Sequence, residues 1–425
     1  MMKRPATDIT GGQPSQRGSM RFPGKLIEVT FSVLAQTVKF TAANIGRACI
    51  LSVLLSVSIA SAQRRPRARD LGIPFEGTPG NLNAITDVAG VEVGYATLIS
   101  GEGSLKVGTG PVRTGVTAIL PRGKRSKDPV FAGWFSLNGN GEMTGTTWVE
   151  ESGFLEGPVL ISNTHSVGIV RDAVIAWELQ HETLFESLAL PVVAETCDAY
   201  LNDINGFHVK PQHVFEALDN ATSGAIAEGN VGGGTGMICY EFKGGTGTAS
   251  RKLSEKDRGY TVGVLVQANH GRRFQLQIVG VPVGRELVEK APFTRGADLY
   301  NERGSIVIVL ATDAPLLPHQ LKRLSRRAAL GLARTGSSSG NGSGDIFIAF
   351  STANPGVASP AKDATQVQML ANQEMDPLFG AATLATEEAI INALVAAETM
   401  IGIDDHKIYS LPHDRLKEVM KKYNR

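Results

Sequence analysis

From residue 63 onward the chain alternates between continuous apolar runs and short, glycine-rich polar turns. Four runs rich in β-branched residues predict strands: "GYTVGVLVQAN" (259–269), "FQLQIVGVPVG" (274–284), "SIVIVLATDAP" (305–315) and "DIFIAFST" (345–352). Residues 306–310 are too uniformly apolar for a strand with one solvent-exposed face, so we expect a sheet buried on both faces.

Shorter patterns complete the prediction. Apolar runs at 115–120, 130–135 and 159–162 indicate strands, and residues 85–99 indicate two paired strands with a turn at Gly90. Helical spacing is found at 168–178, 211–220, 318–334 and 383–399. Buried sheets covered by helices give an α/β layered sandwich. With no internal repeat and no Pro/Ser linker, residues 63–425 are predicted to form a single domain.

The N-terminal region has the composition of a targeting segment. Lys39 and Arg47 precede an uncharged stretch, residues 48–59, which runs into Ala60-Ser61-Ala62. We therefore expect a signal peptide region over 1–62, cleavage after Ala62 and a periplasmic or secreted protein. An uncleaved anchor is the alternative, but the apolar run is shorter than the roughly 20 residues of a membrane span.

Composition removes several classes of function. The chain has 42 Lys and Arg and 41 Asp and Glu. The first 62 residues hold seven of the basic and two of the acidic residues, so the rest of the chain has 35 basic and 39 acidic residues and a net charge of −4. No basic face for nucleic acid is expected. The dispersed histidines predict neither a metal site nor a cofactor. Cys197 and Cys239 form either one disulfide or two thiols.

Three glycine-rich segments suggest chemistry that their context does not support. The runs 230–237 and 243–250 lack the spacing of a phosphate-binding loop, so they indicate backbone packed around an active site or plain turns. Residues 336–340, "GSSSG", fit the letters G-x-S-x-G. A nucleophile elbow needs a strand before the serine and a helix after it; here the order is reversed, and a flexible loop is expected.

The pair Gly304-Ser305 is the more informative serine. It ends a charged, turn-rich stretch, 287–304, which we expect to be an exposed loop, and it opens the buried strand. If the bond before Ser305 were cut, the new α-amine, with a pKa of about 7.7 to 8.0, could act as base for the hydroxyl. Glycine at 304 would leave the scissile carbonyl unshielded. An ordinary serine at a strand start is the other interpretation.

A series of motifs then resembles a known family. "RARDLGIPFEGTPGNLNAITDVAGVEVGYATLI", "NGNGEMTGTTWVEESG", "ISNTHSVGIVRDAV", "ETCDAYLNDING", "NVGGGTGMICYEFKGGTGTASR", "VLVQANHGRR", "RGSIVIVLATDAPLLPHQLKRLSRRAALGLARTGS" and "GSGDIFIAFSTAN" resemble, in order, the L-aminopeptidase/D-esterase family, which includes the β-peptidyl aminopeptidases. The resemblance implies an αββα sandwich like that of N-terminal nucleophile hydrolases with different connectivity. It also implies cleavage between Gly304 and Ser305 into an α chain, 63–304, and a β chain, 305–425, that stay associated.

The resemblance also implies roles for individual residues. Ser305 is the nucleophile, Ser343 and Asp345 are the partners of its amine, Asn269 helps to form the oxyanion hole and Tyr200 lines the site. The acid is glutamate in some relatives, which leaves the reach of the shorter Asp345 open. Binding a substrate's free ammonium calls for a fixed carboxylate, and the candidates are Glu142 and Glu195.

These features predict a self-processing serine aminopeptidase or amidase that acts on short peptides, amino-acid amides or esters and needs no cofactor. The resemblance to the family also implies a homo-oligomer. One alternative is an acyltransferase of the ornithine-acetyltransferase type, although those enzymes use threonine where Ser305 stands. Another is a periplasmic binding protein without catalysis, which would remain uncut. The sequence does not distinguish among L-α, D-α and β-amino acid substrates.

Overall fold

The structure is a computed structural model that describes residues 65–292, 304–359 and 364–425. The residues from Arg65 to Arg425 cluster into one compact unit. The predicted signal region and positions 293–303 of the predicted charged loop lie outside the described residues, so both remain predictions.

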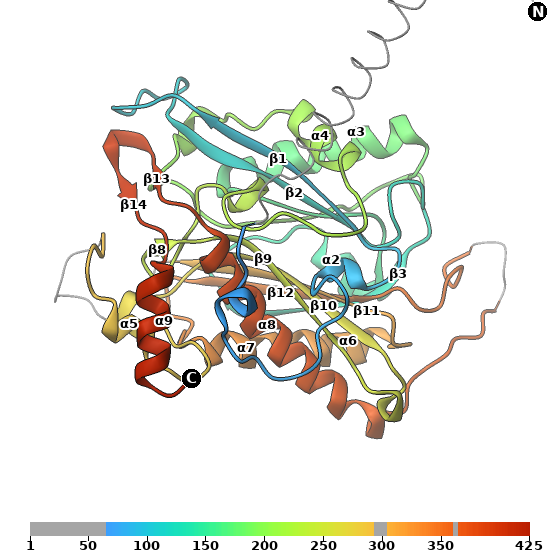
Figure 1. The fold of residues 1–425 in the computed structure, drawn as a ribbon. Coiled ribbons are helices and arrows are strands. Elements are labelled where there is room, and N and C mark those ends of the chain that lie inside the picture. The colour runs from blue at the N-terminus through green and yellow to red at the C-terminus, as the bar shows by residue number, and fades with distance from the viewer. Residues whose placement is uncertain (1–64, 293–303, 360–363) are drawn as a thin grey trace, which may run out of the picture. The chain divides into compact units, whose positions relative to one another are not determined.

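Two large sheets form the centre of the described chain (Figure 1). The four-stranded sheet consists, in spatial order, of β1 (Glu92–Ser100), β2 (Val112–Leu120), β5 (Val159–Ser162) and β6 (Val192–Glu195). The six-stranded sheet consists of β4 (Phe154–Leu155), β3 (Val130–Gly139), β12 (Gly344–Ser351), β11 (Ser305–Thr312), β10 (Thr261–Asn269) and β9 (Gly245–Lys252). Two small hairpins pair β7 (Ile238–Cys239) with β8 (Phe242–Lys243) and β13 (Met400–Ile401) with β14 (Lys407–Ile408).

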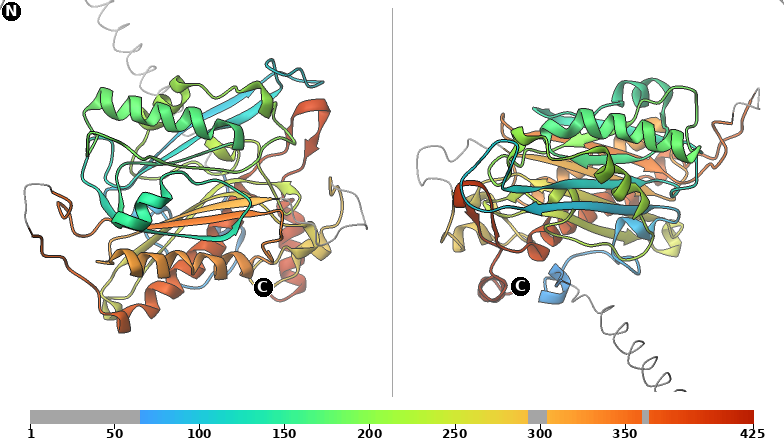
Figure 2. Two further views of the ribbon diagram at one scale, coloured as in Figure 1. Left: turned by 180° about the vertical axis from the view of Figure 1, so that it is seen from behind. Right: turned by 90° about the horizontal axis from the view of Figure 1, so that it is seen from above.

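Helices cover the outer face of each sheet (Figure 2). The four-stranded sheet is covered by α3 (Val167–His181) and α4 (Pro211–Asp219). The six-stranded sheet is covered by α6 (Pro318–Ser325), α7 (Ala328–Arg334) and α8 (Asp376–Ala396). The remaining helices are α2 (Thr146–Ser152), α5 (Val283–Glu286) and α9 (His413–Lys422). A third apolar cluster fills the space between the sheets, and these layers confirm the predicted αββα sandwich.

The central strand explains why its sequence is apolar at every position. Side chains of β11 alternate between the two apolar layers. Ile306 and Ile308 pack toward the helices, whereas Val307 and Val309 pack into the layer between the sheets. The serine that opens the strand has the same parity as Val307, so its side chain belongs to the face between the sheets.

Two sequence predictions are wrong in detail. Residues 274–284 form no strand; a short 3-10 turn, one isolated bridge between Ile278 and Val281, and α5 replace it. Val279 has a φ of +48°, which no strand residue adopts, while the neighbouring apolar side chains still reach the core. Residues 85–87 likewise form a 3-10 turn, because the Asp87 carboxylate accepts hydrogen bonds from nearby groups, including the Leu82 backbone N–H at 2.9 Å.

The helix predicted over 318–334 is divided between α6 and α7. The turn at Arg326 and Arg327 directs their guanidinium groups to different aromatic rings. Arg326 lies 5.2 Å from the Phe135 ring on β3, and Arg327 lies 3.9 Å from the Phe379 ring on α8. The turn therefore joins the sheet to α8.

Helix α8 is apolar enough to resemble a membrane span, yet it serves as the core helix. Residues Asn372–Ala396 meet the length and hydropathy of a span, and 83% of the most apolar window is buried inside the protein.

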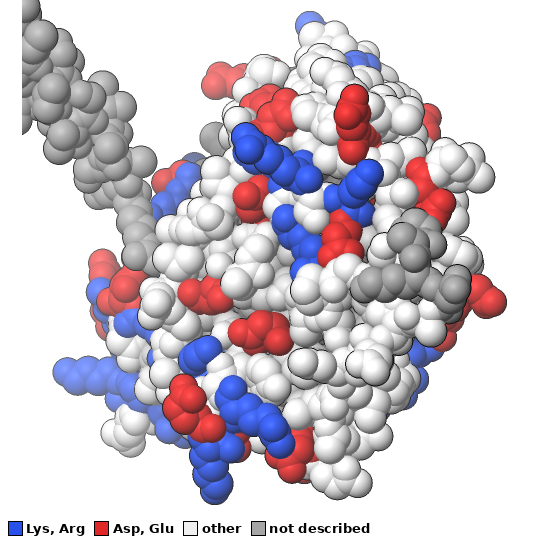
Figure 3. Space-filling model, turned by 90° about the vertical axis from the view of Figure 1, so that its right-hand side faces the viewer, with Lys and Arg blue, Asp and Glu red and all other residues white. Residues whose placement is uncertain are grey.

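On the surface drawn in Figure 3, positive and negative side chains lie interspersed, without a single-sign patch.

A buried carboxylate attaches α8 to the rest of the fold. Glu388 is fully buried and lies 2.7 Å from Arg251 on β9, while both of its oxygens accept hydrogen bonds from Arg69. Burial acts to raise the pKa of Glu388, but the hydrogen bonds from Arg69 and the charge of Arg251 outweigh it and hold that pKa below its usual value. The stabilisation is therefore present above the usual glutamate pKa and is lost as pH falls through the lowered one.

We predict that Glu388→Gln lowers the free energy of unfolding by about 3 to 5 kcal/mol, because it leaves a buried guanidinium without its counter-charge. Urea denaturation at pH 7 measures the change. The matched control is Glu398→Gln, which breaks the solvent-exposed pair of Glu398 with Arg65 and should cost less than about 1 kcal/mol. Equal losses in the two variants would contradict the assignment.

Candidate active site

Three strands bring the candidate residues to one edge of the six-stranded sheet. Strand β10 ends at Asn269, and β11 and β12 begin at Ser305 and Gly344. Ser305 is the register partner of Asn269 in the antiparallel pair β10–β11 and of Gly344 in the parallel pair β11–β12. Opposed residues on neighbouring antiparallel strands place their Cβ atoms about 4.5 to 5.5 Å apart on one face. Asn269 and Ser305 are therefore side-chain neighbours.

The Ser305 hydroxyl is buried and held by the backbone. Only 7% of the residue is exposed, and its Oγ accepts a hydrogen bond of 3.1 Å from the Gly344 N–H. This contact occupies a lone pair of the oxygen and leaves the hydroxyl proton to be given to a base.

The residue before Ser305 has no space for a side chain. A Cβ on Gly304 would stand 2.2 Å from the Asn269 carbonyl oxygen and 2.5 Å from the His270 Cα, and both are backbone atoms that cannot move aside. Gly344 is equally confined, because a Cβ there would stand 2.3 Å from the Asn140 carbonyl oxygen. The close approach of backbone to backbone thus explains glycine at both positions.

The Asn269 amide is fixed in one orientation. Its Oδ1 accepts a hydrogen bond from the Ile238 N–H at 2.8 Å, and its Nδ2 donates to the Cys197 carbonyl oxygen at 3.0 Å. A carboxamide nitrogen carries two hydrogens, so Nδ2 can also donate to an oxyanion formed next to Ser305.

A buried lysine supports the segment that orients Asn269. Lys243 is fully buried and donates to the carbonyl oxygens of Met237 at 2.8 Å and Gly244 at 2.9 Å. Burial lowers the pKa of Lys243 to about 7. Lys243 thereby holds the glycine run 230–237 just before Ile238. This run is packed backbone next to the site, one of the two interpretations that its sequence left open.

Ser343 and Asp345 lie beside the backbone that follows Ser305. Asp345 is fully buried; its Oδ1 accepts hydrogen bonds from the Ser343 hydroxyl at 2.6 Å and from the Ile306 N–H at 3.2 Å. The shorter acid therefore reaches the amide next to Ser305. By register Asp345 pairs with Ile306, on the face opposite the Ser305 side chain, and its carboxylate contacts the backbone N–H that directly follows Ser305.

The two candidate ammonium anchors differ sharply. Glu142 is exposed, whereas Glu195 is 5% exposed and accepts hydrogen bonds from the Glu142 N–H at 3.1 Å and from the Thr164 hydroxyl. Glu195 Oε1 and Gly344 Cα each lie 3.2 Å from the point where a Cβ on Gly141 would stand. Burial raises the pKa of Glu195. Of the two candidates, Glu195 is thus the buried and fixed carboxylate, and it lies beside Gly141 close to Gly344.

Tyr200 lies in the wall next to the site. Its ring stacks on His406 with the centroids 4.4 Å apart and packs against a cluster that contains Leu201 and Met400. Burial raises the pKa of Tyr200. Through Ile238, which packs on the same cluster, this wall adjoins Asn269. The structure thus gives Tyr200 a packing role, and its catalytic role remains a prediction.

The cysteines and the nearest histidine add no base to the site. No disulfide joins Cys197 and Cys239 in the described chain; the Cys239 sulfur lies 3.8 Å from Nδ1 of His270. Burial lowers the pKa of His270 to about 3, so its ring is neutral at physiological pH and too weakly basic to accept the Ser305 proton.

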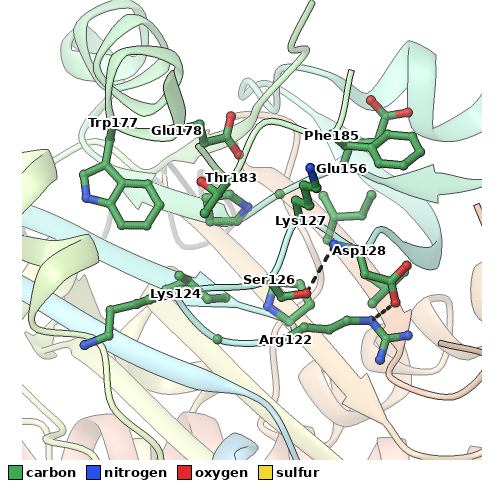
Figure 4. A pocket seen from close by; sticks show the side chains of 17 residues that line it. Arg122, Lys124, Ser126, Lys127, Asp128, Glu156, Trp177, Glu178, Thr183 and Phe185 are labelled. Carbon is green, nitrogen blue, oxygen red and sulfur yellow. Dashed lines mark hydrogen bonds and ion pairs between the residues drawn. The ribbon is translucent and has the colours of Figure 1, made fainter. Parts of the chain in front are cut away.

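A pocket elsewhere on the molecule does not belong to this site. It lies between the β2–β3 loop and α3, and Arg122, Lys127, Glu178 and Thr183 are among its lining residues (Figure 4). Its volume of about 30 Å³ holds one or two water molecules and no peptide. Among the described residues, no group of three or more His, Cys, Asp or Glu side chains could hold a metal ion.

A family model, Peptidase family S58, matches residues 83–408 of the chain. The chain belongs to peptidase family S58. It is 57% identical over 385 residues to the beta-peptidyl aminopeptidase BapA of Sphingosinicella microcystinivorans, covering 88% of this chain and 97% of that protein. It is 50% identical to BapA of Sphingosinicella xenopeptidilytica over 384 residues, with 88% and 95% covered.

Solved structures of two aminopeptidases share the fold. The L-aminopeptidase D-Ala-esterase/amidase of Ochrobactrum anthropi, described as a variant of the Ntn hydrolase fold, superposes with a TM-score of 0.79 at 49% identity, covering 85% of this chain and 99% of that one. A Burkholderia beta-aminopeptidase gives a TM-score of 0.77 at 48% identity, covering 84% and 99%. The S58 chain described here is accordingly an aminopeptidase or amidase, as its motifs predict.

We predict that Asn269→Ala lowers kcat/KM for an aminoacyl p-nitroanilide by about 100- to 1,000-fold, because the loss of one oxyanion donor costs about 2.7 to 4 kcal/mol. Steady-state assays measure it. Asn220→Ala is the control: Asn220 is an exposed residue at the end of α4, in the other helical layer, and its loss should leave kcat/KM nearly unchanged. Wild-type kcat/KM in Asn269→Ala would remove Asn269 from the oxyanion hole.

Proposed function

We propose that the chain is a self-processing serine aminopeptidase whose nucleophile is Ser305, exposed by cleavage of the Gly304–Ser305 bond. One observation carries the proposal: the buried Ser305 hydroxyl lies opposite Asn269 and accepts the Gly344 N–H, directly after a glycine that has no room for a side chain. A serine that merely began a strand would need neither the amide donor nor the confined glycine.

Processing follows from these positions. The Ser305 oxygen attacks the carbonyl carbon of Gly304, and the bond from that carbon to the Ser305 nitrogen breaks, which moves the acyl group from nitrogen to oxygen. The hydroxyl proton ends on the departing nitrogen. Water then hydrolyses the ester and leaves Gly304 as a carboxylate and Ser305 with a free amine and a free hydroxyl. The Asn269 Nδ2 stabilises the oxyanion formed in each addition.

Turnover repeats the chemistry on a substrate. The hydroxyl attacks the acyl carbon, the Ser305 amine takes its proton, and that proton passes to the leaving amine. Asp345, which accepts from the Ser343 hydroxyl and from the Ile306 N–H next to Ser305, stabilises the ammonium. Water releases the acyl group and restores the hydroxyl.

Substrate selection rests on Glu195. Its buried carboxylate pairs with the free ammonium of the substrate, and this restricts the enzyme to N-terminal residues. Because the relatives at 57% and 50% identity are beta-peptidyl aminopeptidases, we include N-terminal β-amino acids among the substrates. We also propose export, with the α chain beginning at Gln63, on the strength of the pattern that ends at Ala60-Ser61-Ala62.

Ser305→Ala tests the nucleophile. It removes the hydroxyl needed for both reactions, so the variant should fold, remain uncut and release no p-nitroaniline from L-alanyl or β-homoalanyl p-nitroanilide. Ser305→Cys should process slowly and retain low activity, because a thiol can make the same acyl shift. Denaturing gels and the two assays measure these outcomes.

Ser338→Ala is the control for the nucleophile test, because Ser338 is an exposed serine of the "GSSSG" segment. It should process and hydrolyse nearly as the wild type does. The proposal fails if Ser305→Ala is still split and still active.

Glu195→Gln tests the ammonium anchor. We expect kcat/KM for free-amine substrates to fall about 10- to 100-fold, mainly through KM, since a hydrogen bond to a charged group is lost. Because burial raises the pKa of Glu195 and only the ionised form pairs with ammonium, wild-type kcat/KM should fall as pH decreases through that pKa. That limb should vanish in the variant. The control Glu142→Gln alters an exposed side chain and should change little; the reverse ranking would make Glu142 the anchor.

A further inference from the structure

Ser339 belongs to the "GSSSG" segment that fails as a nucleophile elbow, yet its side chain reaches the active site. The segment follows α7 and precedes β12, as its sequence predicts. The segment has no regular secondary structure, and within it the Ser339 hydroxyl donates a hydrogen bond to Asp345 Oδ2. The other carboxylate oxygen, Oδ1, accepts from Ser343 and from the Ile306 N–H.

The backbone at Ser339 shows that its side chain is not incidental. Ser339 has a φ of +54°, in the left-handed region where glycine is relaxed and other residues are strained. The same loop carries glycine at 336, 340, 342 and 344. A serine at this strained position, in contact with a buried carboxylate, indicates a function for its hydroxyl.

Neighbouring contacts fix the position of that hydroxyl before any substrate binds. The Ser339 N–H donates to the Ser337 hydroxyl at 3.1 Å, and the Asn138 side chain on β3 donates to the Gly340 carbonyl oxygen at 2.6 Å. The loop is thus attached to β3 of the same sheet directly after Ser339, and a hydrogen bond within the loop holds the Ser339 N–H.

We propose that Ser339 is a positioning residue that holds the Asp345 carboxylate toward the amine of Ser305. The inference rests on the proposed function, in which that amine accepts the hydroxyl proton and becomes an ammonium. Asp345 Oδ1 accepts a hydrogen bond from the Ile306 N–H, one residue after Ser305, and in the proposed function this carboxylate acts on the Ser305 amine. The Ser343 hydroxyl donates to Oδ1 of Asp345 and the Ser339 hydroxyl donates to Oδ2, which keeps the carboxylate in one orientation. Hydrogen bonds donated to a carboxylate also favour its ionised form.

Ser339→Gly isolates the hydroxyl, because glycine adopts the same backbone conformation without strain. We expect kcat to fall about tenfold or more with little change in KM. In this proposal Ser339 holds the Asp345 carboxylate and Asp345 acts on the Ser305 amine, so neither side chain binds the substrate. The acidic limb of the kcat profile should move to higher pH, because the ionised carboxylate loses a donor. Processing should slow in parallel.

Two further variants complete the experiment. Ser339→Asn supplies an N–H donor on a residue that tolerates a left-handed backbone, and it should restore part of kcat and of the pH profile. Ser338→Gly changes the exposed neighbour, whose Oγ accepts only from Gln275 among its described contacts, and it should behave as wild type. Thermal unfolding of each variant separates stability from catalysis.

Wild-type kcat and an unmoved pH profile in Ser339→Gly would overturn the inference. So would equal losses in Ser339→Gly and Ser338→Gly, or a loss in Ser339→Gly that follows only a lowered unfolding temperature. An uncut but folded Ser339→Gly chain supports it. If Ser305→Ala is inactive while Ser339→Gly is normal, only this inference fails; if Ser305→Ala is active, the proposed function itself fails.

Discussion

The registers of three adjacent strands determine the rest of the site. Hydrogen bonding of β11 to β10 on one side and β12 on the other places Ser305 level with Asn269 and with Gly344. A slip of one residue would turn Ser305 to the helical face and bring Ile306 to the face between the sheets. The apolar layers on both faces oppose such a slip, so burial of the central strand and orientation of the Ser305 side chain have the same cause.

Close packing of backbone against backbone is the second constraint. At Gly304 and at Gly344 a side chain would collide with carbonyl oxygens of neighbouring strands, and the glycine run before Ile238 is held by a lysine without exposure to solvent. These contacts bring N–H and carbonyl groups within reach of Ser305 and Asn269. The site therefore uses backbone groups as much as side chains.

The sequence was sufficient for the parts of the structure that depend on pattern. Continuous β-branched runs predicted β10, β11 and β12, and the layered sandwich followed from them. Residues 274–284 have the same composition but form a turn, because a left-handed Val279 and local bonding decide their backbone, not hydrophobicity. The motifs also named Ser305, Asn269, Ser343 and Asp345, which the structure brings together. Hydrogen bonds of main-chain atoms, such as those of Ile238 and Cys197 with Asn269, do not depend on which side chain the residue carries. They could therefore not be predicted from the amino-acid sequence.

The central claim is that the Gly304–Ser305 bond is broken in the mature enzyme. N-terminal sequencing and intact mass measurement of the purified, denatured wild-type protein test it most directly. The account predicts two chains, 63–304 with 242 residues and 305–425 with 121 residues, the smaller beginning Ser-Ile-Val-Ile. A single active chain that runs unbroken through Ser305 would contradict it.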